Sequence, residues 1–221
     1  MKLKKLSVQI SVFLTDGIMN PSKYKKNIND VFEGLFSNEF LSINIDGVPE
    51  DMPLVKCSSK DGMISYDFSR KRINFIMSFL SKNKIISFDE LKSKTIKLIN
   101  ENLLSVTDIS RIGVAFVYYY DIDDKNVEYW INKYKFPLTD KTTSELSYSI
   151  NNILTKEDFV YNNIISISNI NVNGKVVPAI SVDFNNNAVK SMKEEQIDYI
   201  FNKCNKYSED YVASLLNEEN E

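Results

Sequence analysis

The sequence contains no histidine, and its 221 residues include only six glycines, two cysteines and three arginines. The missing histidine excludes Ser-His-Asp and Cys-His nucleophilic catalysis, histidine-containing zinc sites and histidine general bases. The few glycines are scattered and form no phosphate-binding loop. Catalysis would therefore have to depend on carboxylates, lysine, tyrosine, cysteine or a hard metal ion bound by oxygen ligands.

A basic excess is also missing, because the formal net charge is −3 and the pI is about 5.3. Phosphate neutralisation supplies most of the affinity of proteins that bind duplexes, so nucleic acid is a less favoured partner. No apolar run approaches the roughly 20 residues that span a bilayer, and we expect no membrane association. Alternating polar and apolar residues from Leu6 to Val12 indicate a strand and not a signal peptide. We expect a cytoplasmic protein.

The composition is that of an ordinary globular protein, with 43% hydrophobic and 26% charged residues. A chain of this length buries about 70% of its unfolded surface, which is enough for a self-sufficient core. Thirteen Phe and twelve Tyr give that core many large, rigid side chains. We therefore expect one large domain or two small ones.

The first half predicts an antiparallel sheet covered by helices. A helix is predicted after Asn20-Pro21 and a second at the Ser87–Glu90 capping box. Strands are predicted at residues 6–15, 41–45, 64–68, 73–79 and 109–120. The longest of them, 109–120, is apolar on both faces and is expected at the centre of the sheet. The order suits a ferredoxin-like βαββαβ lobe over residues 1–123, within an α+β fold.

The second half, residues 124–221, predicts a hairpin-rich α+β lobe that is closed by a long helix. After a short helix at 126–134, strands are predicted at 146–153, 164–172 and 176–184, the last two joined by Asn173-Gly174. The amphipathic helix over 193–216 is about 36 Å long. No Pro/Gly-rich linker separates the halves, so one continuous domain is an alternative.

Three carboxylates, Asp121, Asp123 and Asp124, follow the central strand directly and are a candidate Mg²⁺ or Ca²⁺ site. The EF-hand pattern fails because Lys125 and Asn126 occupy positions that need other residues. A solvated acidic turn that caps the next helix is the alternative interpretation. Since no other feature requires one, we expect no cofactor.

Basic residues gather at a predicted hairpin tip, Arg70, Lys71 and Arg72, where guanidinium groups suit phosphate or carboxylate recognition. The tip is a candidate site for nucleic acid or an acidic partner, and a turn that keeps the hairpin soluble is the alternative. Lysines also cluster at 23–26 and 82–97. They either form a weak electrostatic footprint for nucleic acid or lie on solvated helix faces. Cys57 follows Lys56, and a neighbouring cation lowers the pKa of a thiol, so Cys57 is a candidate reactive thiol.

The final helix carries an aromatic-rich face, on which Tyr207 and Tyr211 are predicted to bind a partner. A protein partner is the most favoured kind, and self-association is a further possibility.

Two segments carry a resemblance to a known family. One runs from Ile109 through Ser110-Arg111-Ile112-Gly113-Val114 into a tyrosine-bearing strand, and the other is Ile180 to Phe184 followed by the final helix. Together they resemble an uncharacterised, sporadically distributed prokaryotic α+β family of about this length. Ala115 and Tyr119 stand where that family is expected to have arginine and asparagine. Sporadic distribution implies association with mobile elements or phage defence.

Three functions follow as hypotheses. The first is a non-enzymatic protein-binding or inhibitor subunit in phage–host conflict, immunity or a toxin–antidote pair. The second is a metal-dependent nucleic-acid-processing factor that uses the acidic turn and the basic hairpin tip. The third is a small-molecule sensor with its pocket between the lobes.

Overall fold

The computed structural model describes residues 3–42, 47–80, 86–120, 147–156 and 159–217. In these segments nine strands form one antiparallel sheet, in the order β2-β3-β4-β5-β1-β6-β9-β8-β7. The strand bounds are β1 Leu3–Leu14, β2 Asn38–Ser42, β3 Val55–Ser58, β4 Ile64–Phe68, β5 Arg72–Ser78, β6 Ile109–Tyr120, β7 Ser147–Lys156, β8 Phe159–Val172 and β9 Lys175–Asn186.

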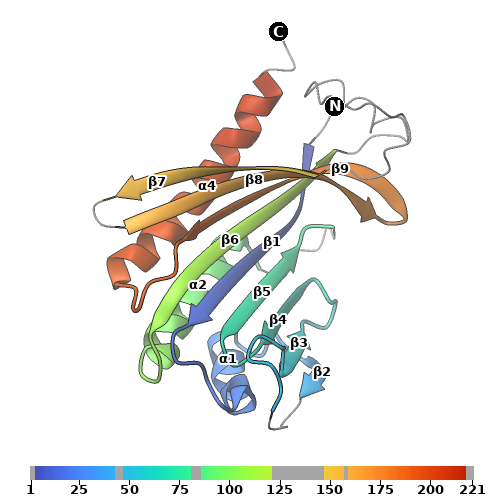
Figure 1. The fold of residues 1–221 in the computed structure, drawn as a ribbon. Coiled ribbons are helices and arrows are strands. Elements are labelled where there is room, and N and C mark those ends of the chain that lie inside the picture. The colour runs from blue at the N-terminus through green and yellow to red at the C-terminus, as the bar shows by residue number, and fades with distance from the viewer. Residues whose placement is uncertain (1–2, 43–46, 81–85, 121–146, 157–158, 218–221) are drawn as a thin grey trace.

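The strands of this sheet are strongly twisted. The helices lie on one of its faces, which points toward the back in the view of Figure 1. A 3₁₀ turn, η1, covers Pro21–Tyr24 and leads into α1, Lys25–Val31. Helix α2, Phe88–Leu98, continues into a π-helical turn, η2, Ile99–Leu103. The long helix α4, Glu194–Asn217, contacts β6 and β9, and it passes behind β7 and β8 in the view of Figure 1. The predicted α+β class is confirmed at this level, with a mainly β composition.

The core lies between the helices and the sheet because apolar residues alternate along the central strands. On β1 the side chains of Val8, Ile10 and Val12 are fully buried, whereas the residues between them are partly exposed. Phe75 and Phe116 extend the same buried layer on β5 and β6. Ile200 and Phe201 of α4 close it from the helical side.

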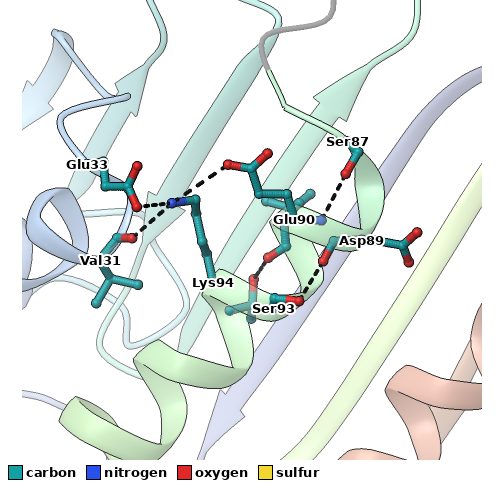
Figure 2. Close-up of polar contacts among 9 residues, drawn as sticks. Val31, Glu33, Ser87, Asp89, Glu90, Ser93 and Lys94 are labelled. Atoms are coloured by element: carbon teal, nitrogen blue, oxygen red, sulfur yellow. Dashed lines mark hydrogen bonds and ion pairs between the residues drawn. The ribbon is translucent and has the colours of Figure 1, made fainter.

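Most predicted strands are confirmed. The tight turn at Asn173-Gly174 joins β8 to β9, and both residues have positive φ angles, 52° and 83°, as a two-residue hairpin requires. The Ser87 hydroxyl accepts a hydrogen bond from the Glu90 amide at 3.1 Å, so the predicted cap of α2 is present. Figure 2 shows this contact at the start of the helix.

Two local features differ from the prediction. The helix predicted after Asn20-Pro21 is present, but it starts as a 3₁₀ turn before it becomes α-helical, and Asn20 makes no side-chain cap. No strand is predicted between residues 45 and 64, yet β3 lies there and pairs with β2 and β4. Its four residues are too short for a periodicity to stand out in the sequence.

The two predicted lobes share the sheet, because β6 of the first half pairs with β9 of the second over seven residue pairs, Gly113–Tyr119 with Asn185–Ala179. Helix α4 packs on this junction. Its buried Ser208 hydroxyl lies 2.5 Å from the Tyr118 hydroxyl of β6. The halves are therefore joined by both backbone and side-chain contacts.

Candidate functional site: the open face of the sheet

The second face of the sheet carries no helix among the described segments, and we call it the open face. Its residues are those that alternate with the core residues along each strand. At its centre they are Ser11 and Phe13 of β1, Asn74 of β5, Gly113 and Val117 of β6, Asp183 and Asn185 of β9, Asn162 and Ile164 of β8, and Asn151 and Ile153 of β7. The face thus draws on both halves of the chain.

A row of directly paired residues crosses this face from β4 to β7. Strand pairing aligns Asp67, Asn74, Ser11, Gly113, Asn185, Asn162 and Ile153 in succession. Neighbours in such a row lie about 5 Å apart and interact directly. Five of the seven have polar side chains, which is unusual for the middle of a large sheet.

Hydrogen bonds order the first part of this row. The Asn74 amide donates to Asp67 Oδ1 at 2.6 Å, and the Ser11 hydroxyl donates to Asn74 Oδ1 at 2.8 Å. Gln9 donates in turn to the Ser11 hydroxyl at 2.9 Å. These bonds hold the side chains in one arrangement, so little conformational freedom remains to be lost when a ligand binds.

A second network lies across β9, β8 and β7. Asn185 donates to Asp183 Oδ2 at 2.9 Å, and Asn162 donates to Asn185 Oδ1 at 3.2 Å and to Asn187 Oδ1 at 2.8 Å. Asn151 of the outermost strand donates to Asn162 Oδ1 at 3.0 Å. Burial raises the pKa of Asp183, while the Asn185 hydrogen bond and the charge of Arg111 oppose that rise.

Gly113 separates the two networks on β6. A Cβ at this position would lie 3.3 Å from Asn185 Cβ and 3.5 Å from Asp183 Oδ1. The missing side chain therefore gives the β9 polar groups the space they occupy beside β6. Apolar side chains, Phe13, Val117 and Ile164 among them, surround the polar rows and are partly exposed.

The structure separates the three basic residues of the hairpin tip. Arg70 donates to the Val48 carbonyl at 3.2 Å, and Lys71 donates to the Thr15 carbonyl at 2.9 Å and lies 3.9 Å from Glu50. These two residues therefore connect neighbouring loops. Arg72 instead lies on the open face beside Phe13. Their predicted role in binding stays a prediction.

The acidic turn, Asp121, Asp123 and Asp124, lies outside the described residues, as does the predicted helix 126–134. Within the described segments no group of three or more Cys, Asp or Glu residues is placed to hold a metal ion. The metal prediction is therefore untested.

Tyr207 and Tyr211 face the sheet. The Tyr207 ring stacks on Phe184 with centroids 4.8 Å apart, and Tyr211 packs against the cluster formed by Tyr120, Ile180 and neighbouring residues of β8 and β9. Both are only partly buried. Partner binding by these residues stays a prediction, and their packing gives them a part in attaching α4.

The lysines of α2 are matched by carboxylates. Lys94 lies 2.9 Å from Glu33 and 3.8 Å from Glu90, and it also donates to the Val31 carbonyl at 3.5 Å. Figure 2 shows Lys94 reaching from α2 to the end of α1. Lys92 and Lys97 pair with Asp89 and Glu101. This helix therefore presents a mixed surface, which does not support a phosphate-binding footprint; Lys82 and Lys84 lie outside the described residues.

The thiols are buried. Cys57 is 6% exposed and Cys204 is fully buried. Burial raises the pKa of Cys57, and it raises the pKa of Cys204 to about 12. A reactive thiolate at Cys57 is not supported, because the neighbouring Lys56 does not offset burial.

Comparisons with known proteins assign neither a family nor a function to this chain. No protein-family model matches the chain, and no curated protein matches it significantly. None of the helices in the described residues combines the length and the hydrophobicity that crossing a membrane requires.

Sequence reasoning missed the open face. Its residues come from seven strands, and the alternation in any one strand shows only which residues share a side. The pairing of Asn74 with Ser11 and of Asn185 with Asn162 depends on the strand order. The sequence of β8 gives no signal for it either, because three of its Asn and Ser residues lie on each of the two alternating sets of positions.

Proposed function

We propose that this chain is a non-enzymatic protein-binding subunit and that the open face of the sheet is its binding surface. The observation that carries the proposal is a large sheet face on which hydrogen-bonded polar rows alternate with partly exposed apolar side chains. Protein interfaces have this mixed composition, with apolar anchors inside polar surroundings.

The size of the face supports this function. Six strand spacings separate β4 from β7, so the seven strands span about 29 Å, and the central twelve-residue strands are about 40 Å long. This part of the sheet covers a plane on the order of 1,000 Å², and a standard interface needs about 800 Å² from each partner. Phe13, Val117 and Ile164 are partly exposed on it, whereas Asn74, Asn162 and Asn185 are buried. A small ligand would leave most of this surface unused.

Charge favours protein over nucleic acid as the partner. The open face carries two carboxylates, Asp67 and Asp183, beside two guanidinium groups, Arg72 and Arg111, so these four side chains give no excess of positive charge. The chain as a whole has a net charge of −3, and neither source supplies the basic excess that binding to a polyphosphate backbone requires. From the resemblance to a sporadically distributed prokaryotic family, we further propose that the partner belongs to phage–host conflict, immunity or a toxin–antidote pair, with this chain as the inhibitor or partner subunit.

We also propose a ferredoxin-like architecture for the first half of the chain. The strand order β4-β5-β1-β6, antiparallel throughout, with α1 and α2 on one face, supports a ferredoxin-like βαββαβ arrangement. Strands β2 and β3 extend this arrangement at one edge. The hairpins β7-β8-β9 with α4 correspond to the proposed second lobe.

A capture experiment tests the function. The tagged chain is used to isolate partners from its native host, with nuclease treatment, and is compared with Ile164→Arg, which places a charge on the open face. Asn202→Arg, at an exposed position of α4, is the matched control. We expect a nuclease-resistant, stoichiometric protein partner that Ile164→Arg loses and Asn202→Arg retains. Equal capture by both variants would rule out the open face.

A second candidate is a small-molecule sensor. A surface pocket of about 430 Å³ lies between α2 and α4, lined by Lys5, Phe79, Phe88, Asn205 and Glu209 among others. Ligand sites have volumes of about 300–1,000 Å³, and this one draws residues from both halves of the chain. A thermal-shift ligand screen with Phe88→Ala as the comparison tests this function.

A further inference from the structure

Two of the three arginines in the chain flank one aromatic ring on the open face. Phe13 of β1 is directly paired with Arg72 of β5 on one side and with Arg111 of β6 on the other. The guanidinium carbons of Arg72 and Arg111 lie 5.7 and 5.3 Å from the centre of the Phe13 ring. The ring thus positions both cations from neighbouring strands.

Neither guanidinium is neutralised by the residues that the structure describes. No described carboxylate lies within 4.0 Å of Arg72 or Arg111, and the Nε atoms of both are buried without a hydrogen-bond partner. The Nε of Arg70, only two residues from Arg72, is also buried without a hydrogen-bond partner, but its Nη1 donates to the Val48 carbonyl. Asp183 is close enough for the charge of Arg111 to act on its pKa but forms no ion pair with it.

Such a pair of cations suits an oxyanion. A guanidinium presents its donors in a planar fork that matches a carboxylate or a phosphate, and stacking on an aromatic ring restricts its orientation before the ligand arrives. Of these two anions, the carboxylate fits better, because a phosphate carries more negative charge and Asp183 lies near Arg111. A single carboxylate of a ligand adds only one negative charge beside Asp183.

We propose that Arg72, Phe13 and Arg111 form a carboxylate-binding site that receives an acidic side chain of the partner protein. The inference rests on the proposed function, since it names the chemistry by which the open face recognises its partner. Charge complementarity identifies the partner as one with an exposed Asp or Glu at the centre of its interface. Phe13 contributes the apolar contact beside that carboxylate.

Nuclear magnetic resonance tests the site directly, because three arginines give only three side-chain Nε–Hε signals. The full chain is titrated with an end-blocked pentaglutamate peptide and, separately, with pentaglutamine and inorganic phosphate. We expect the Arg72 and Arg111 signals to shift with pentaglutamate and the Arg70 signal to stay in place. Arg72→Lys and Arg111→Lys, which keep the charge but lose the fork, should each weaken binding at least fivefold, whereas Arg70→Lys changes it less than twofold.

Several outcomes would overturn the site. They are an absence of shifts at Arg72 and Arg111, equal shifts at all three arginines, equal binding of pentaglutamine, and tighter binding of phosphate than of pentaglutamate. Thermal melting of each variant establishes that it is folded. If pentaglutamate fails while Ile164→Arg still abolishes partner capture, the carboxylate site is wrong and the binding function stands. If pentaglutamate binds while Ile164→Arg retains the partner, the proposed function is wrong.

Discussion

Asn162 and Asn185 join two adjacent strands through their side chains, the Asn162 amide donating to Asn185 Oδ1 at 3.2 Å. Asn162 is 8% exposed and Asn185 is fully buried. Leaving a buried amide without hydrogen bonds costs stability, so this pair favours one arrangement of the polar row of the open face. The same bonds that satisfy the amides also order the proposed binding surface.

Replacing Asn162 should therefore destabilise the fold. Asn162→Leu removes the donor to Asn185 and Asn187 and the acceptor of Asn151, which leaves the buried Asn185 Oδ1 without this partner. We expect a loss of about 1–3 kcal/mol in the free energy of unfolding, measured by urea denaturation. Asn151→Ala, at an exposed position of the same network, is the control and should cost less than about 0.5 kcal/mol. Equal losses for the two variants would contradict the account.

Asp183 gives a pH dependence of defined sign. Burial raises its pKa, so the folded state holds the proton more tightly than the unfolded state does, and Asp183 lowers stability as pH rises through the folded pKa. Asp183→Asn should therefore be more stable than the parent at pH 7, and the difference should vanish below the unfolded pKa of about 3.8. Thermal unfolding at several pH values measures this. A parent that is the more stable of the two at pH 7 would refute the assignment.

Arg111 also acts on this group. Because its charge opposes the rise in the Asp183 pKa, Arg111→Gln should move that pKa further upward, as seen by carboxyl carbon NMR. Arg70→Gln is the matched control, and it should leave the Asp183 titration unchanged.

The contact between Tyr118 and Ser208 should stabilise the attachment of α4 to the sheet. Tyr118→Phe leaves the buried Ser208 hydroxyl without this partner, and Ser208→Ala leaves the tyrosine hydroxyl without its own. Each should cost about 1–2 kcal/mol, and the double variant should cost less than the sum of the two. Urea denaturation of the three variants gives the coupling energy. Strictly additive losses would show that the contact contributes nothing.

The ion pair between Lys94 and Glu33 predicts a second, opposite pH dependence. Hydrogen bonding and the charge of Lys94 lower the Glu33 pKa below 4.5. The stabilisation is present above pH 4.5 and is lost as pH falls through the folded pKa. Lys94→Met should therefore melt at a lower temperature than the parent at pH 7. The difference in melting temperature between the two should become smaller at acidic pH. Lys193→Met, which affects only an exposed pair with Glu195, is the control. A difference in melting temperature that is independent of pH would contradict a stabilising ion pair between Lys94 and Glu33.

Local chemistry predicted much of the fold. The alternation of Val8, Ile10 and Val12 located β1, the apolar run up to Tyr120 located β6 at the centre of the sheet, and Asn173-Gly174 located the β8–β9 turn. Each depends on residues that are close in sequence, where periodicity and turn chemistry are informative. The 3₁₀ start after Asn20 was missed because a Pro at the first position fits both kinds of helix.

The candidate site was hardly predictable, because it depends on strand order. Arg72 was grouped with Arg70 and Lys71, its neighbours in sequence, although β-strand alternation and the pairing of β1 place it with Arg111 instead. Phe13 looked like an ordinary strand residue. No local pattern indicates that three residues separated by up to 98 positions share one surface.

Site-specific photo-crosslinking tests the binding surface most directly. A photoreactive phenylalanine analogue is placed at Val117 on the open face, at Tyr119 beside it, or at exposed Asn202 of α4, and each chain is irradiated in its native host. The account predicts crosslinks to one protein partner from positions 117 and 119 and none from position 202. Crosslinks to that partner from position 202 alone would show that the helical side, and not the open face, binds it.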